Sequence, residues 1–174
     1  MRSPHPNGDT ANGASPNGRR DKVRSAMTTV DVVSEIVIAR PRDEVARYAS
    51  DPDNATAWYV NIKAVQWKSP KPLAVGARFA FTARFPGREL SYTYEAVELV
   101  PDTRFVMRTA EGPFPMETTY LWEDGPNGST TMTLRNRGEP SGFTGIVAPV
   151  LTLAIKRANR KDLARLKALL EAGG

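Results

Sequence analysis

The 174-residue sequence contains no cysteine, and its single histidine is His5. The absence of cysteine excludes disulfide bonds, thiolate metal ligands and cysteine nucleophiles. His5 lies in a segment with almost no large apolar side chain, so a histidine general base or zinc ligand is excluded from any folded part. We therefore expect no metal site and no cofactor.

Long apolar runs are also missing. No apolar stretch approaches the roughly 18 residues that a membrane span needs, and residues 1–26 lack the apolar region of a secretory signal. A cytoplasmic protein is the resulting expectation, and the length suits one domain.

Residues 1–26 are rich in Pro, Gly, Asn, Ser and Arg. Such a segment cannot bury enough apolar surface to offset the entropy lost on ordering. We predict a disordered leader over residues 1–26 and one domain over residues 27–174. Of the net charge of +5, the leader carries five basic and two acidic residues, whereas the rest carries 19 and 17. The basic balance therefore belongs mainly to the leader and gives little support to nucleic-acid binding.

The patterned part of the chain begins with a β-branched stretch, residues 30–39, that predicts a strand. Pro41 then stands where a proline can open a helix, because the first helical turn needs no amide donor from it. Asp51 followed by Pro52 predicts a second short helix over residues 52–58, with Asp51 as its N-cap.

Apolar and polar residues then alternate with a period of two, which predicts five or six further strands. These strands cover residues 62–68, 75–85, 90–100, 104–110, 116–123 and 130–136. Turn signals such as Pro86-Gly87 and Pro101-Asp102 separate them. Because the spacing is short and regular, the strands should be antiparallel neighbours in one sheet.

From Ser141 onward, apolar residues recur every three or four positions and predict a long helix to the C-terminus. Pro149 should either kink this helix or mark its start. The predicted outer face is strongly basic. It holds Lys156, Arg157, Arg160, Lys161, Arg165 and Lys167 against only Asp162 and Glu171.

The order of these elements, together with five short stretches of sequence, resembles the START-like superfamily, also called SRPBCC, and its polyketide cyclase/dehydrase-like branch. The stretches are IVIARPRDEVARYASDPDNATAW (36–58), VGARF (75–79), YEAVELVPDTRF (94–105), GSTTMTL (128–134) and DLARLKALLE (162–171). The resemblance implies an α+β helix-grip fold, in which a curved antiparallel sheet wraps around a long C-terminal helix and leaves a cavity between them. Members bind lipids, sterols, quinones, polyketides or plant hormones, and a minority are enzymes.

One set of candidate site residues is aromatic or methionine and falls on strand faces predicted to point inward. It comprises Trp58, Phe79, Phe81, Met107 and Tyr120. These side chains either form plain core or line a small-molecule cavity, since such cavities are mostly apolar. Ile146 and Val150 on the long helix are predicted to close over them.

A second set of candidates is polar. Thr118 shares a predicted face with Met116 and Tyr120, and Asn136 shares one with Leu134. A polar group facing a cavity would favour a ligand or water there, because a buried polar group needs a partner. Glu95 is a further candidate, but the strand 90–99 has apolar side chains on both faces, so an outward, solvated Glu95 is the alternative.

Three functions follow from these observations. The first is binding of a small hydrophobic molecule between the sheet and the C-terminal helix. The second is a cofactor-independent cyclase or dehydrase that uses polar cavity residues; no motif pairs Glu95 with another acid or base, so an enzyme is not the first expectation. The third is a protein-interaction module with a collapsed cavity.

The basic helix face is either a solvated surface or a site of transient contact with an anionic membrane. Nucleic-acid binding is not expected, because no aromatic residues interleave with the basic ones.

Overall fold

The computed structural model describes residues 29–85, 88–139 and 148–173. The predicted leader, the Pro86-Gly87 turn and the beginning of the long helix predicted from Ser141, including Ile146, lie outside the described residues.

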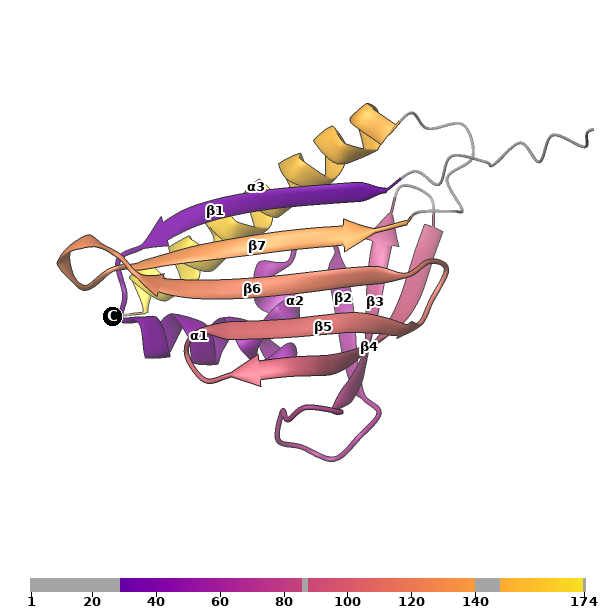
Figure 1. Ribbon diagram of the computed structural model, residues 1–174, viewed down its shortest axis with the longest axis horizontal. Helices are drawn as coiled ribbons and strands as arrows, with labels where there is room; N and C mark the ends of the chain where they lie inside the picture. Colours follow the sequence, from indigo (N-terminus) through magenta and orange to yellow (C-terminus); the bar gives the residue numbers. More distant parts are fainter. Residues whose placement is uncertain (1–28, 86–87, 140–147, 174) are drawn as a thin grey trace, which may run out of the picture.

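Seven antiparallel strands form one sheet in the order β1-β7-β6-β5-β4-β3-β2. The strands are β1 (Val30–Ile38), β2 (Ile62–Trp67), β3 (Arg78–Phe85), β4 (Arg88–Val100), β5 (Arg104–Glu111), β6 (Met116–Asp124) and β7 (Thr130–Gly138). The helices are α1 (Arg42–Ser50), α2 (Ala55–Trp58) and α3 (Ala148–Ala172), with 3₁₀ turns η1 (Pro52–Asn54) and η2 (Pro126–Gly128). In Figure 1, β2 and β3 cross the direction of β5, β6 and β7, so the sheet is strongly curved. The predicted α+β helix-grip fold is confirmed.

Local sequence explains the short helices between β1 and β2. Pro41 precedes α1, and Asp43 and Glu44 lie in its first turn, where the helix dipole favours acidic groups. The Asp51 side chain accepts a hydrogen bond from the backbone amide of Asp53 at 3.0 Å, which caps η1 as predicted. Together these helices lead the chain from the edge strand β1 across to β2.

The long helix α3 packs along the inner face of β1 through the C-terminal half of its length. Leu163, Leu166 and Leu170 are buried there, with Ile38 of β1 in the same core cluster. The Arg40 side chain donates from Nε to the carbonyl oxygen of Leu170 at 2.8 Å, which ties the end of α3 to the end of β1. Because β1 pairs with β7, the first and last strands hold α3 against one side of the sheet.

The N-terminal turns of α3 leave this layer. Pro149 stands in the first turn of the described part of α3, and the residues before Ala148, which would distinguish a kink from a helix start, lie outside the described residues. Figure 1 shows that end of α3 projecting past β1, and the Val150 and Leu153 side chains are 60% and 51% exposed. No helix among the described residues is long and apolar enough to cross a membrane.

The core is rich in aromatic rings that stand on the concave face of the sheet. Trp58, Phe79, Phe105 and Trp122 are fully buried. The rings of Phe79 and Phe81 meet edge to face at 5.2 Å between centroids, a favourable arrangement for their quadrupoles. This aromatic core extends under α3 and ends at a cavity.

Candidate functional site

A cavity of about 160 Å³ lies between the concave face of the sheet and α3. Its wall from the sheet is mostly apolar or aromatic, and α3 closes it from the other side. The lining residues are Tyr59, Asn61, Ile62, Phe81, Ala83, Tyr92, Tyr94, Met107, Met116, Thr118, Asn136, Ile155, Ala158, Asn159 and Asp162. An apolar cavity with a few placed polar groups is the usual form of a small-molecule site.

The cavity reaches the surface at its half-exposed lining residues. These residues are Tyr59, Asn61, Ile62, Met116, Asn136, Ile155 and Ala158. The Asn61 carbonyl accepts a hydrogen bond from the backbone amide of Arg84 at 2.9 Å, which fixes the backbone at Asn61.

The structure brings four of the predicted site residues together at the cavity. Phe81, Met107, Thr118 and Asn136 all line it, from β3, β5, β6 and β7. Their side chains point inward because each stands in phase with buried neighbours along its strand.

The other aromatic candidates lie behind the cavity wall. Trp58 and Phe79 are 0% exposed and belong to the core, and Tyr120 is buried next to Trp58 with ring centroids 5.9 Å apart. These residues support the lining side chains without bordering the cavity.

The remaining predictions fall elsewhere. Ile146 lies outside the described residues, and Val150 is exposed on the projecting end of α3 instead of closing over the sheet. Glu95 is on the convex outer face, where its carboxylate receives a hydrogen bond from Nε of Arg78 at 2.7 Å. It belongs to a row of alternating charges that crosses six strands, formed by Asp31, Arg137, Glu117, Arg108, Glu95 and Arg78. Opposite charges on adjacent strands stabilise this register, and none of them faces the cavity.

Two tyrosines form the first polar feature of the site. The hydroxyls of Tyr59, which lines the cavity, and Tyr120 are 2.6 Å apart and share a hydrogen bond. The Tyr59 ring also stacks on Trp58 at 3.8 Å between centroids. Burial raises the pKa of both tyrosines well above the ordinary range, so both hydroxyls stay protonated.

A chain of three polar side chains forms the second feature. The Thr118 hydroxyl donates to Oδ1 of Asn136 at 3.1 Å, and Nδ2 of Asn136 donates to Oδ1 of Asn159 on α3 at 3.0 Å. Nδ2 of Asn159 is buried and has no hydrogen-bond partner among the described residues. This chain connects β6, β7 and α3 across one side of the cavity.

The third feature is Asp162 on α3, whose side chain lines the cavity and is 4% exposed. Its Oδ1 atom accepts a hydrogen bond from the backbone amide of Val60 at 2.8 Å. No hydrogen-bond donor among the described residues reaches Oδ2. Burial raises the pKa of Asp162 to about 6, a shift that the Val60 hydrogen bond and the Arg165 charge only partly oppose.

Sequence reasoning did not single out Tyr59, Asn159 or Asp162 as site residues. A usable signal was present on α3. Ile155, Asn159, Asp162 and Leu166 follow one another at intervals of four, three and four, so the two polar residues stand on the same face as the buried leucine. A polar residue within an apolar helical stripe indicates either a buried hydrogen bond or a binding site. Asn159 and Asp162 form buried hydrogen bonds and also line the cavity.

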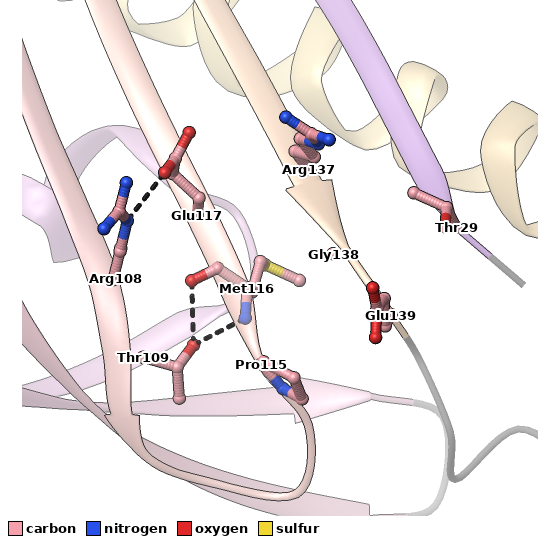
Figure 2. A pocket seen from close by; sticks show the side chains of 9 residues that line it. All are labelled: Thr29, Arg108, Thr109, Pro115, Met116, Glu117, Arg137, Gly138 and Glu139. Carbon is pink, nitrogen blue, oxygen red and sulfur yellow. Dashed lines mark hydrogen bonds and ion pairs between the residues drawn. The ribbon is translucent and has the colours of Figure 1, made fainter. Parts of the chain in front are cut away.

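A larger pocket of about 380 Å³ lies at the surface, where β5 and β7 end and β6 begins (Figure 2). Figure 2 shows Arg108 directed at Glu117, with 2.7 Å between Nε and Oε2, and the Thr109 hydroxyl bonded to the backbone of Met116. Arg108, Glu117 and Thr109 are therefore already engaged with neighbouring groups, and the Arg108–Glu117 pair belongs to the row of alternating charges. The inner cavity is the better candidate site.

Neither pocket resembles a metal centre. Within the described residues, no group of three or more His, Cys, Asp or Glu side chains could hold a metal ion.

Solved structures with the same fold come from distant organisms. A START superfamily protein from Mycobacterium smegmatis aligns with a TM-score of 0.73 at 12% identity, covering 83% of this chain and 99% of that one. The Zhui aromatase/cyclase from Streptomyces sp. R1128 aligns with a TM-score of 0.67 at 17% identity, covering 82% and 94%. Ginseng major latex-like protein 151 from Panax ginseng aligns with a TM-score of 0.64 at 12% identity, covering 81% and 97%. At these identities the likeness shows a shared fold.

No protein with a curated description matches this sequence. The family profile described as polyketide cyclase / dehydrase and lipid transport matches residues 29–171, which include every described strand and nearly all of α3. The resemblance found in the sequence is thereby confirmed, and the chain belongs to the polyketide cyclase/dehydrase and lipid transport family.

Proposed function

We propose that this protein binds a small, largely apolar molecule in the cavity between the sheet and α3. The observation that carries this proposal is the cavity itself, an apolar space that ends in a group of polar side chains on one side. Family membership supports the proposal, because the family is described in terms of polyketide and lipid ligands. Phe81, Met107, Thr118 and Asn136 are the predicted residues that would contact the ligand.

The cavity volume limits the ligand. At about 160 Å³ the cavity is smaller than the roughly 300–1,000 Å³ of typical small-molecule sites. An apolar cavity of about 150 Å³ in another protein holds benzene. We therefore expect a ligand the size of a single ring, or a larger molecule of which one ring enters while the rest lies in the opening.

Titration with ethylbenzene tests this function. NMR spectra of the full chain should change at the cavity residues on addition of ethylbenzene. Ala83→Trp fills the cavity, so the Ala83 variant should remain folded and lose binding. Thr82→Trp is the matched control, because Thr82 is the neighbouring, half-exposed residue of β3 and does not line the cavity. Absence of any ethylbenzene binding by the unmodified protein would favour an interaction module with a closed cavity.

A second candidate function is cofactor-independent chemistry on the bound molecule. Asp162 favours it, because a carboxyl group with a pKa of about 6 can take or give a proton near neutral pH. The hydrogen-bonded hydroxyls of Tyr59 and Tyr120 lie in the same region and could polarise a carbonyl oxygen. Exchange of a carbonyl ligand's α-protons for deuterium, measured with the unmodified chain and with Asp162→Asn, separates an enzyme from a binder.

A membrane surface is the partner that the outer face of α3 fits best. Lys156, Arg157, Arg160 and Lys161 form no ion pair with any described residue, whereas four ion pairs elsewhere join neighbouring strands of the sheet. The exposed side chains of Val150 and Leu153 precede them on the same helix. Basic residues beside exposed apolar ones favour contact with an anionic bilayer.

Vesicle sedimentation tests this contact. The full chain should sediment with vesicles that contain phosphatidylserine and stay in solution with vesicles of phosphatidylcholine alone. The Arg157→Glu/Arg160→Glu double variant should no longer sediment with these vesicles. Lys68→Glu is the control and should leave sedimentation unchanged, because Lys68 directly follows β2, the edge strand opposite β1. Equal sedimentation of both variants would show that α3 is a solvated surface.

A further inference from the structure

The charge of the cavity narrows the class of ligand further. The inference rests on the binding function proposed above and concerns which molecules the cavity selects. Asp162 contributes the only carboxyl group among the described residues that line it, and none of those lining residues is Lys, Arg or His. Any charged ligand therefore meets a carboxylate and no cation.

The carboxylate of Asp162 is incompletely satisfied. Oδ1 receives the Val60 amide at 2.8 Å, whereas Oδ2 has no donor among the described residues. The nearby charge that most affects it is Arg165, an exposed residue three positions further along α3. A buried carboxylate gains most from a partner that brings both a positive charge and a hydrogen-bond donor, because such bonds are roughly twice as strong as neutral ones.

The aromatic wall suits the same partner. Tyr59, Phe81, Tyr92 and Tyr94 present four rings to the cavity. An ammonium group or the polarised carbon beside it is attracted to the face of an aromatic ring, more strongly where water is excluded. The Tyr59 hydroxyl forms its hydrogen bond with Tyr120, and no tyrosine hydroxyl among the described residues bonds to Asp162.

We propose that the cavity selects small apolar molecules that carry a protonated amine, with Asp162 as the counter-ion, and rejects carboxylic acids of the same size. The apolar part of such a ligand lies against Phe81 and Met107, and the amine lies at the side of the cavity formed by α3. A molecule of roughly eight non-hydrogen atoms suits the volume, by comparison with the benzene-sized cavity noted above.

Three probes of similar size test this selectivity. Benzylamine, ethylbenzene and benzoate differ mainly in charge, and each is titrated into the full chain at pH 7.5 with NMR as the readout. Benzylamine should bind at least about tenfold more tightly than ethylbenzene, since one charge-assisted hydrogen bond in a partly dry site supplies that factor. Benzoate should bind at least about tenfold more weakly than ethylbenzene, because like charges repel in a cavity of low dielectric constant.

Asp162→Asn is the decisive variant. Asparagine keeps the Oδ1 acceptor for the Val60 amide but removes the charge, so the fold should be retained. The preference for benzylamine over ethylbenzene should fall to within about threefold, and benzoate should regain affinity. Glu171→Gln is the matched control: it removes one negative charge from the same helix at a residue bonded to Ala39 and Lys167, away from the cavity.

The outcomes separate the two proposals. If ethylbenzene binds and benzylamine binds no more tightly, or if Asp162→Asn leaves the preference unchanged, the amine selectivity is wrong and the apolar binding function stands. If none of the three probes binds, the binding function fails as well. If the Asp162 variant does not fold, the ranking of the three probes on the unmodified chain still decides the question.

Discussion

Asp162 of α3 accepts a hydrogen bond at 2.8 Å from the backbone amide of Val60, in the loop between α2 and β2. Asp162 lines the cavity, and Val60 immediately precedes Asn61, which also lines it. This bond fixes the loop to the long helix. It also holds a carboxyl group in a largely apolar cavity. Burial disfavours the ionised form of this group, so the free energy of unfolding should depend on pH.

Replacing Asp162 with asparagine should stabilise the protein at neutral pH. The folded-state pKa of about 6 lies above the ordinary 3.8, so the native state holds more protons than the unfolded state between about pH 4 and pH 6. The unmodified protein therefore loses stability as pH rises through this window, by roughly 2–3 kcal/mol for a shift of about two pKa units. Urea unfolding at pH 7.5 should show Asp162→Asn to be more stable by up to that amount, with the difference shrinking toward pH 4.

Glu171 supplies a control of opposite sign. Its pKa is lowered, first by the hydrogen bond from the Ala39 amide, so its carboxylate stabilises the fold above the ordinary pKa and loses that effect as the solution is acidified. Glu171→Gln should therefore destabilise at pH 7.5 and approach the unmodified protein at low pH. No stability gain from Asp162→Asn would show that burial does not dominate the Asp162 environment, and a gain from Glu171→Gln would contradict the stabilising bond to Ala39.

The hydroxyl pair of Tyr59 and Tyr120 should behave as one unit. Tyr59→Phe removes one partner and leaves the buried Tyr120 hydroxyl unpaired, which should cost about 1–2 kcal/mol. The Tyr59→Phe/Tyr120→Phe double variant should lose clearly less than the sum of the two single changes, because no unpaired hydroxyl remains. A double-mutant cycle from urea unfolding measures the coupling. Tyr48→Phe is the control, since its hydroxyl bonds to no described residue; additive losses at Tyr59 and Tyr120 would contradict the pairing.

The buried stripe of α3 can be tested by moving a charge around the helix. Leu166 is 0% exposed, so Leu166→Asp places a carboxylate in the core and should cost several kcal/mol of a total of about 5–15. Ala164→Asp adds the same charge two residues earlier on the exposed face and should change stability by little beyond helix propensity. Thermal unfolding monitored by circular dichroism compares the two, and equal melting temperatures would mean that the helix packs through a different face.

The fold could be predicted because each strand carries a clear alternation and the linking turns carry Pro, Gly or Asp. Phe79, Phe81 and Ala83 are buried on one face of β3, as their spacing predicts. The strand β4 was ambiguous for a physical reason. Its pairing with β5 contains irregularities between Thr93 and Tyr94 and between Ala96 and Glu98, so no single alternation runs through it.

The site was harder to predict than the fold. Val150 belongs to an apolar helical pattern, yet its side chain is exposed because α3 extends beyond the sheet there. The point at which a helix extends past the sheet is set by the tertiary structure and not by the local sequence. Asp162 was assigned to the basic outer face from its neighbours in sequence, although its position relative to Leu166 places it inside. The hydrogen bond from Val60 joins residues 102 positions apart, a relationship that no local pattern contains.

The cavity makes a quantitative prediction at two phenylalanines. Phe105 is 1% exposed and does not line the cavity, so Phe105→Ala should cost about 3–5 kcal/mol, the usual penalty for truncating a packed ring. Phe81 is as deeply buried but borders the cavity, so its ring has fewer packed neighbours on that side. Phe81→Ala should therefore cost clearly less, because fewer contacts are lost.

The same change should alter binding. Phe81→Ala enlarges the cavity by about the volume of a ring, so the variant should bind naphthalene more tightly than the unmodified protein does, while Phe105→Ala should not. Urea unfolding and NMR titration with naphthalene measure the two effects on the same samples. Equal losses of stability at both positions, with no gain in naphthalene affinity for the Phe81 variant, would mean that Phe81 is ordinary core and that the space beside it does not admit a ligand.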